Sequence, residues 1–287
     1  MTVPPDQSPF VVSFDWLQQR LGQPDLKIVD ASWYLPAQNR DGSAEYAESR
    51  IPGAVFFNQD SIVDPKSDLP HTIAGSDDFA RAAGALGLSE TDTIVVYDGP
   101  GMFTAPRVWW LLRIFGAGKA YVLDGGFDAW KTQGLPVETG QPAAPEPASF
   151  TASLNARAVS GLDEMRTIVE TGAAQIADAR GPGRFTGVEA EPRKGMRSGH
   201  MPGARNVPFN TLSKGGKLKP LRELRMVLES SGLDLQKPVV TTCGSGVTAA
   251  VITLALQSLG HRDNTLYDGS WSEWGGRDDT VIVTGEA

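Results

Sequence analysis

The feature that most constrains the fold of this chain is an internal repeat. The segment VVYDGPGMFTAPRVWWLLRIFG in the first half has a counterpart, VVTTCGSGVTAAVITLALQSLG, in the second. At one constant offset of 144 residues, without a gap, identical residues recur: Val95, Val96, Gly116, Asp124, Gly125 and Trp130 match Val239, Val240, Gly260, Asp268, Gly269 and Trp274. Self-similarity at a fixed period indicates repeated structural units. The 287 residues therefore predict two homologous domains, each large enough for its own core.

The matching continues upstream with an offset that widens by a few residues, as loop insertions would produce. KIVDAS pairs with QIADAR, and ESRIPGAVFFN pairs with RSGHMPGARNVPFN. Between the halves, the prolines of ETGQPAAPEPASF disfavour a helix and favour an extended linker. We predict an N-terminal domain at 1–138, a linker at 139–150 and a C-terminal domain at 151–287.

Each half alternates short β-branched runs with helical patterns. IVVY, AYVL, PVVTT and TLYD have the composition of buried strands, and VWWLLRIF and AAVITLALQSL that of helices between them. This alternation predicts α/β domains, each with a mainly parallel sheet flanked by helices. Ligands of such sheets bind beyond the carboxyl ends of the strands. Cys243 lies at such a position, directly after PVVTT.

Charge and hydropathy limit the partners of the chain. A formal charge of −8 and a pI near 5.0 disfavour binding to nucleic acid or to an anionic membrane, since both rely on a basic protein surface. The first residues, MTVPPDQSPFVV, lack the basic start and apolar run of a signal peptide. No window approaches the roughly 18 apolar residues of a membrane span. We expect a soluble cytoplasmic protein.

Cysteine and histidine counts limit the chemistry further. The chain has one cysteine, Cys243, so it has no internal disulfide and no cysteine-based zinc site. Its three histidines, His71, His200 and His261, do not have the spacing of a shared metal site. We expect neither a metal nor a cofactor.

The loop after the cysteine is the strongest candidate site. Its residues are Cys243, Gly244, Ser245, Gly246, Val247 and Thr248, and a helix begins near Ala249. Two glycines permit a tight turn with inward-pointing amide N–H groups, and the helix N-terminus adds partial positive charge. Both favour a thiolate and, after reaction, a persulfide. The alternative is a small buried core cysteine, which the Gly-Ser-Gly turn disfavours.

The first half provides an internal comparison for this loop. Gly99 occupies the position that matches Cys243, within GPGMFT. The first domain therefore lacks a nucleophile at this position, and we expect one active site per chain.

Several motifs together resemble the rhodanese superfamily, and within it the tandem-domain mercaptopyruvate sulfurtransferases. The resemblance covers almost the whole chain and rests on DASWYLP, IPGAVFF, APRVWWLLR, GRFTG, RSGHMPGA and CGSGVTA. Thiosulfate-using relatives typically carry basic residues immediately after the cysteine, whereas mercaptopyruvate enzymes carry Gly-Ser-Gly, as this chain does. An uncharged loop suits mercaptopyruvate, whose charge lies several bonds from its sulfur.

The resemblance implies roles for individual residues. Cys243 is the expected nucleophile, and the loop residues Gly244, Gly246, Val247 and Thr248 are expected to bind the substrate. Arg184 in GRFTG and Arg197 in RSGH are expected to clamp its carboxylate and ketone, because a planar guanidinium binds carboxylate oxygens bidentately.

The resemblance also suggests a proton relay across the two domains. Its members are expected to be Ser245, His71 as base and Asp60 as the residue that orients the histidine. Asp64 and Asp68 lie in the same loop and remain alternatives to Asp60. His200 belongs to the SGHMPGA turn, and we interpret it as structural.

These features predict a sulfurtransferase. Sulfur would move from 3-mercaptopyruvate through a persulfide on Cys243 to a thiol acceptor, such as thioredoxin or a small thiol, or to cyanide, with release of pyruvate. A thiosulfate sulfurtransferase and a non-catalytic persulfide carrier remain alternatives. A cysteine phosphatase is disfavoured, since that class needs an arginine where this chain has Ala249.

Overall fold

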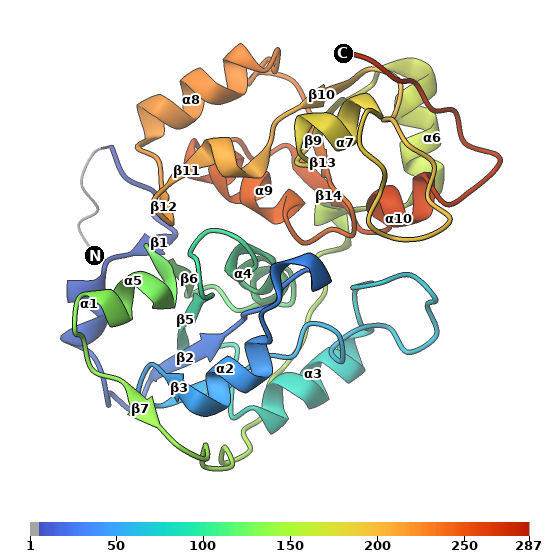
Figure 1. The fold of residues 1–287 in the computed structure, drawn as a ribbon. Helices are drawn as coiled ribbons and strands as arrows, with labels where there is room; N and C mark the ends of the chain where they lie inside the picture. Colours follow the sequence, from blue (N-terminus) through green and yellow to red (C-terminus); the bar gives the residue numbers. More distant parts are fainter. Residues whose placement is uncertain (1–5, 287) are drawn as a thin grey trace.

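The computed structural model describes residues 6–286, which form two domains of the same architecture (Figure 1). Five strands of the first domain form a sheet with the order β1-β6-β5-β2-β4. The second domain repeats this order as β8-β14-β13-β9-β10. Every neighbouring pair in the two sheets is parallel. The predicted α/β fold with two parallel sheets is confirmed.

The strands are short. The first sheet contains β1 (Val11–Val12), β2 (Leu26–Asp30), β4 (Ala54–Phe56), β5 (Thr93–Tyr97) and β6 (Ala120–Leu123). The second contains β8 (Val159–Ser160), β9 (Gln175–Asp178), β10 (Ala204–Asn206), β13 (Val239–Thr242) and β14 (Asn264–Tyr267). Two antiparallel pairs lie outside these sheets: β3 (Ser49–Arg50) with β7 (Glu138–Thr139), and β11 (Ser213–Lys214) with β12 (Lys217–Leu218).

Helices connect the strands and cover the sheets. The first domain contains α1 (Phe14–Gln18), α2 (Gly42–Glu48), α3 (Ser76–Ala85), α4 (Ala105–Ile114) and α5 (Gly126–Thr132). The second contains α6 (Leu162–Thr171), α7 (Pro182–Thr186), α8 (Leu221–Ser230), α9 (Ala249–Ser258) and α10 (Ser270–Trp274). Single 3-10 turns form at η1 (Pro36–Gln38), η2 (Ala156–Ala158) and η3 (Phe209–Leu212). Within residues 6–286, no helix is both long and apolar enough to cross a bilayer.

Helices α4 and α9 explain how the two domains join. Every residue of α4 except Arg113 is buried, and so is every residue of α9 except Gln257. A helix that is apolar all round needs cover on all sides. The two helices pack against each other between the sheets, so one continuous hydrophobic core contains residues of both domains (Figure 1). The interface is therefore part of the core and holds the two domains in a fixed arrangement.

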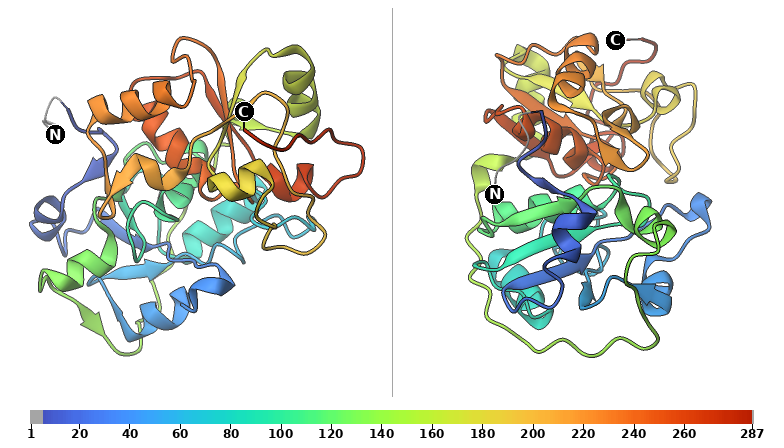
Figure 2. Two further views of the ribbon diagram at one scale, coloured as in Figure 1. Left: turned by 45° about the horizontal axis from the view of Figure 1, so that its top comes forward. Right: turned by 90° about the vertical axis from the view of Figure 1, so that its left-hand side faces the viewer.

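The segment between the domains is extended. Residues 141–155 contain neither helix nor strand, and Figure 2 shows this part of the chain along the outside of the first domain. The N–H of Ala148 donates to the carbonyl of Gly84 at 2.8 Å, and the ring of Phe150 packs edge-on against Phe79. The connection is thus fastened to the first domain. The domain boundaries given above stay a prediction.

Candidate active site

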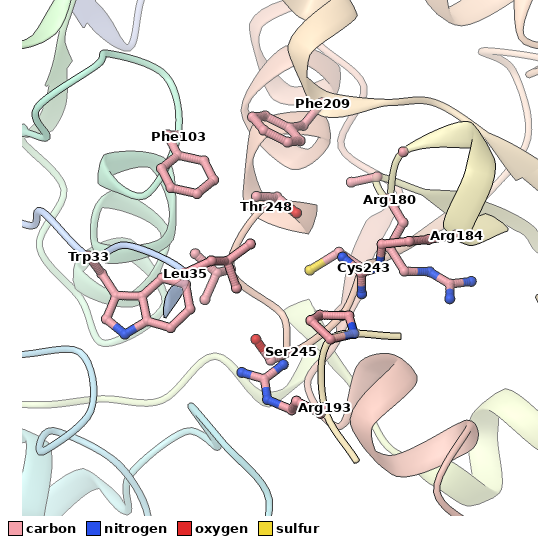
Figure 3. A pocket seen from close by; sticks show the side chains of 15 residues that line it. Trp33, Leu35, Phe103, Arg180, Arg184, Arg193, Phe209, Cys243, Ser245 and Thr248 are labelled. Carbon is pink, nitrogen blue, oxygen red and sulfur yellow. The ribbon is translucent and has the colours of Figure 1, made fainter. Parts of the chain in front are cut away.

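The cysteine loop lies at the carboxyl end of β13, in the cleft between the domains. Cys243 directly follows Thr242, the last residue of β13, and α9 begins at Ala249. A cavity of about 80 Å³ opens in front of the loop (Figure 3). Residues of both domains line it: Trp33, Leu35, Phe103, Ala179, Arg180, Gly181, Arg184, Pro192, Arg193, Phe209, Cys243, Gly244, Ser245, Val247 and Thr248.

Cys243 faces this cavity although it is almost completely buried. Its relative exposure is 2%, and Figure 3 shows its sulfur directed into the space between the arginines and the apolar side chains. The narrowness of the cavity accounts for the low exposure. The thiol therefore has little contact with bulk water.

The amide N–H groups around the sulfur are free to bind an anion. No carbonyl or side chain of residues 6–286 accepts a hydrogen bond from the N–H groups of residues 244–248. The left-handed backbone of Gly246, with φ of 78°, allows the tight turn that forms this cradle. Val247 and Thr248 line the cavity, whereas Gly246 is not among its lining residues. At Gly244, a Cβ would lie 3.0 Å from Nη2 of Arg184, so a larger residue would require the guanidinium to shift.

The first domain shows what such a loop binds. Asp98 matches Thr242 in the repeat, and its carboxyl group accepts four backbone hydrogen bonds of 2.6 to 3.0 Å, from Gly101, Phe103, Thr104 and Ala105. Burial raises the pKa of Asp98 above its ordinary value, and the four N–H donors oppose that rise. In the second domain the corresponding N–H groups have no such partner. They can therefore hold a thiolate or a persulfide.

The structure brings together the three residues of the predicted relay. Nδ1 of His71 lies 2.9 Å from Oγ of Ser245, and Nε2 lies 2.9 Å from Oδ1 of Asp60. The indole N–H of Trp33 donates to both carboxylate oxygens of Asp60 at 3.0 Å. Asp60 therefore orients the histidine. Asp64, one of the alternatives, instead accepts a bond from the N–H of Lys66.

Electrostatics set the protonation of this relay. The hydrogen bond from His71 lowers the pKa of Asp60, which is an ionised acceptor at neutral pH. Burial lowers the pKa of His71 below its ordinary 6.5, although Asp60 opposes the effect. Because Asp60 can only accept, we infer that Nε2 of His71 carries the proton. The lone pair of Nδ1 then faces the hydroxyl of Ser245, as a general base requires.

Arginines form one wall of the cavity, and one of them, Arg193, lacks a direct ion-pair partner in the described part of the chain. Arg180 and Arg184 share the carboxylate of Glu191, and Arg180 also pairs with Asp178. Arg193 makes no hydrogen bond or ion pair with any residue in 6–286. Burial lowers its pKa, and the nearby Cys243 sulfur opposes this change. Arg193 was not predicted from the sequence, because its loop has no periodic pattern or motif that marks it.

Arg197 does not reach the cavity, which corrects its predicted role. Its guanidinium donates to the carbonyl groups of Trp274, Gly275, Arg277 and Thr280. These bonds fix the segment after α10 to the turn before β10. Arg197 therefore supports the fold, and Arg193 stands with Arg184 where a substrate carboxylate can bind.

Apolar side chains form the opposite wall. Trp33, Leu35 and Phe103 come from the first domain, and Phe209 of the second lies against Phe103 with ring centroids 5.4 Å apart (Figure 3). An apolar wall lowers the local dielectric constant, which strengthens the attraction between the arginines and a bound anion.

His200 does not line the cavity. Its ring is stacked on that of Phe185, and its Nδ1 lies 2.9 Å from the carbonyl oxygen of Phe185.

Comparison with known proteins identifies relatives that share this arrangement. A family model for the rhodanese-like domain matches residues 13–133 and, a second time, residues 161–277. The two matches confirm the prediction of tandem rhodanese-like domains.

Individual relatives match nearly the full length. The 3-mercaptopyruvate sulfurtransferase of Homo sapiens is 42% identical, and the alignment covers 92% of this chain and 91% of that protein. The 3-mercaptopyruvate sulfurtransferase of Escherichia coli K12 is also 42% identical, and the alignment covers 94% of this chain and 96% of that protein. The thiosulfate/3-mercaptopyruvate sulfurtransferase 1, mitochondrial, of Arabidopsis thaliana is 40% identical over 96% of this chain and 79% of its own length.

Solved structures agree. The crystal structure of SseA from Escherichia coli, a 3-mercaptopyruvate sulfotransferase, superposes with a TM-score of 0.84 at 39% identity, covering 91% of this chain and 98% of that one. The 3-mercaptopyruvate sulfurtransferase from Leishmania major gives a TM-score of 0.79 at 30% identity, covering 96% of this chain and 76% of that one.

Proposed function

Because this chain belongs to the rhodanese family, with two such domains in tandem, we propose that it transfers sulfur from 3-mercaptopyruvate to a thiol acceptor or cyanide through a persulfide on Cys243. The observation that carries this proposal is the position of Cys243. Its sulfur faces a cavity between free amide N–H groups and the unpaired Arg193.

The first step forms a sulfur–sulfur bond. The Cys243 thiolate attacks the sulfur of mercaptopyruvate, the carbon–sulfur bond breaks, and its electron pair leaves as pyruvate enolate. The thiol proton of the substrate passes to Ser245 and His71 and then to the enolate carbon, which yields pyruvate. The persulfide anion remains on Cys243, where the N–H groups of the loop and the N-terminus of α9 stabilise it.

The charge of the cavity favours a monocarboxylate substrate. Glu191 and Asp178 pair with Arg180 and Arg184, whereas Arg193 has no direct ion-pair partner among residues 6–286 and its charge is only partly offset by the nearby Asp60. Mercaptopyruvate carries one negative charge, whereas thiosulfate is a dianion. Arg184 and Arg193 are the proposed carboxylate and ketone clamp. Thiosulfate transfer is the second candidate, because the name of the Arabidopsis relative includes both donors.

The second step passes the outer sulfur to an acceptor thiol, which attacks it and releases the Cys243 thiolate. Thioredoxin and small thiols are the proposed acceptors. Alternation of the two steps gives ping-pong kinetics. We also propose a cytoplasmic location, although the name of one relative places that protein in mitochondria.

Mass spectrometry tests the proposal directly. After incubation with mercaptopyruvate and without acceptor, the peptide that contains Cys243 should gain the mass of one sulfur atom, and dithiothreitol should remove it. Cys243→Ser is the control and should gain nothing. A wild-type protein that gains no sulfur contradicts the proposal. Multiple turnovers of pyruvate release distinguish an enzyme from a persulfide carrier, and the ratio of kcat/KM for mercaptopyruvate and thiosulfate identifies the preferred donor.

A further inference from the structure

The repeat gives the molecule two equivalent contacts between its domains. Asp124 of the first domain accepts a hydrogen bond from the N–H of Leu218 in the second at 2.8 Å. Asp268, its counterpart in the repeat, accepts one from the N–H of Ile73 in the first domain at 2.9 Å. Each aspartate thus holds the loop that crosses over from the other domain.

His71 and Gly216 occupy matching positions in these two loops. Each lies five residues before a helix, α3 or α8, and each has a left-handed backbone, with φ of 61° and 74°. Glycine adopts this conformation without strain, whereas a residue with a side chain does not. The loop that carries the relay histidine therefore has a left-handed backbone at a histidine where the matching loop has glycine, and contacts from outside the loop can stabilise this backbone.

Arg107 supplies contacts that the His71 loop has and the Gly216 loop lacks. It is buried on α4, and its Nη2 lies 2.6 Å from the carbonyl oxygen of His71 and 2.9 Å from Oδ1 of Asp268. Its Nη1 lies 3.4 Å from the carbonyl oxygen of Gly246 in the cysteine loop. The equivalent position in the second half is Val251, which is buried and apolar. The contact around Gly216 therefore has no counterpart of this arginine.

We propose that Arg107 and Asp268 are positioning residues for the proton relay. Arg107 binds the carbonyl of residue 71 and Asp268 binds the N–H of residue 73, so the pair fixes the backbone that directly follows the histidine side chain. The same arginine reaches the loop that contains Ser245, and in this way the pair sets the separation of Nδ1 and Oγ. This inference rests on the proposed sulfur transfer from mercaptopyruvate.

A double-mutant cycle tests the proposal through turnover. In wild-type background, Arg107→Lys should lower kcat with mercaptopyruvate roughly 10- to 100-fold, the range for a relay displaced by about 1 Å, while KM changes little. In the His71→Ala background, the same substitution should change kcat less than about twofold, because coupled residues are not additive. If Arg107→Lys lowers kcat by the same factor in the wild-type and His71→Ala backgrounds, the proposal is wrong. Asp268→Asn, in the same cycle, replaces Arg107→Lys if that variant does not fold.

Asp124→Asn is the matched control, since Asp124 makes the equivalent contact with the Gly216 loop, which carries no residue of the relay. It should leave kcat unchanged even where it lowers the melting temperature. If Asp124→Asn lowers kcat as much as Asp268→Asn does, the effect belongs to the domain interface in general, and the positioning role is wrong.

Nitrogen-15 NMR of the three histidines separates this inference from the proposed function, because it needs no substrate. Wild-type His71 should show the proton on Nε2, set by Asp60, and an Nδ1 shift that reports the hydrogen bond from the Ser245 hydroxyl; Asp124→Asn should retain both. Arg107→Lys should move the Nδ1 shift toward that of an imidazole nitrogen without a hydrogen bond. An unchanged Nδ1 shift in Arg107→Lys contradicts the inference whatever the activity, whereas an inactive wild type with the expected spectra contradicts only the proposed function.

Discussion

Asp98 and Thr242 occupy equivalent positions in the repeat, and the Asp98 carboxyl group fills an amide cradle that Thr242 leaves open. Four backbone N–H groups donate to Asp98, while the Thr242 hydroxyl is within hydrogen-bond distance of Ser270 Oγ. Duplication has thus produced one cradle with an internal anion and one that is free for an anion formed in the reaction.

This relationship predicts that a carboxylate at residue 242 inactivates the enzyme. In Thr242→Asp, the new carboxylate should occupy the N–H groups of the cysteine loop and repel the Cys243 thiolate. Persulfide formation, measured by mass spectrometry, should be abolished. Thr242→Ser, which keeps the hydroxyl, is the control and should retain it. A Thr242→Asp protein that still forms the persulfide contradicts the role of the cradle.

In the first domain, loss of the internal anion should affect stability alone. Asp98→Asn removes one acceptor oxygen from a buried, fully bonded group, so the free energy of unfolding should fall by about 1 to 3 kcal/mol. Urea denaturation measures this change. The activity per folded molecule should stay constant, because Asp98 does not line the cavity. A selective loss of kcat in Asp98→Asn would contradict this assignment.

The two arginines of the cavity region predict opposite phenotypes. Arg193→Met should raise KM for mercaptopyruvate roughly 10- to 100-fold, because it removes a hydrogen bond to a charged group, which contributes about 1.5 to 3 kcal/mol. Arg197→Met should leave KM nearly unchanged and lower the melting temperature, because the carbonyl groups near Gly275 lose their donor. Steady-state kinetics and thermal unfolding distinguish the two, and a reversed pattern would restore the clamp predicted from the sequence.

The lowered pKa of His71 predicts the pH dependence of the relay. Above this pKa the imidazole is neutral and can accept a proton. This pKa lies below 6.5, and as the pH falls through it the imidazole becomes protonated, so the base is lost and kcat declines. Asp60 raises the pKa of His71, so Asp60→Asn should lower it further. An NMR titration of His71 in wild type and in Asp60→Asn measures the shift, and an increase in the variant contradicts the assigned pair.

The sequence predicted those parts of the site that a local motif carries. Cys243 and the glycine turn follow a buried strand, which fixes them at the carboxyl end of a parallel sheet whatever the rest of the chain does. Arg193 could not be found in this way. It lies in the irregular segment between α7 and β10, where no periodicity limits the direction of a side chain. Arg197, four residues later, is bonded to carbonyl groups of a segment about 80 residues away in the chain.

The sequence by itself determined the two-domain α/β fold, the place of Cys243 after a buried strand and the glycine at the matching position of the first half, because these follow from periodicity, a repeat and the type of residue at one position. Only the tertiary structure decided which arginine faces the sulfur, which aspartate meets His71, and how Arg107 and Asp268 hold that histidine. These contacts join residues from different domains, and their geometry depends on how α4 packs against α9.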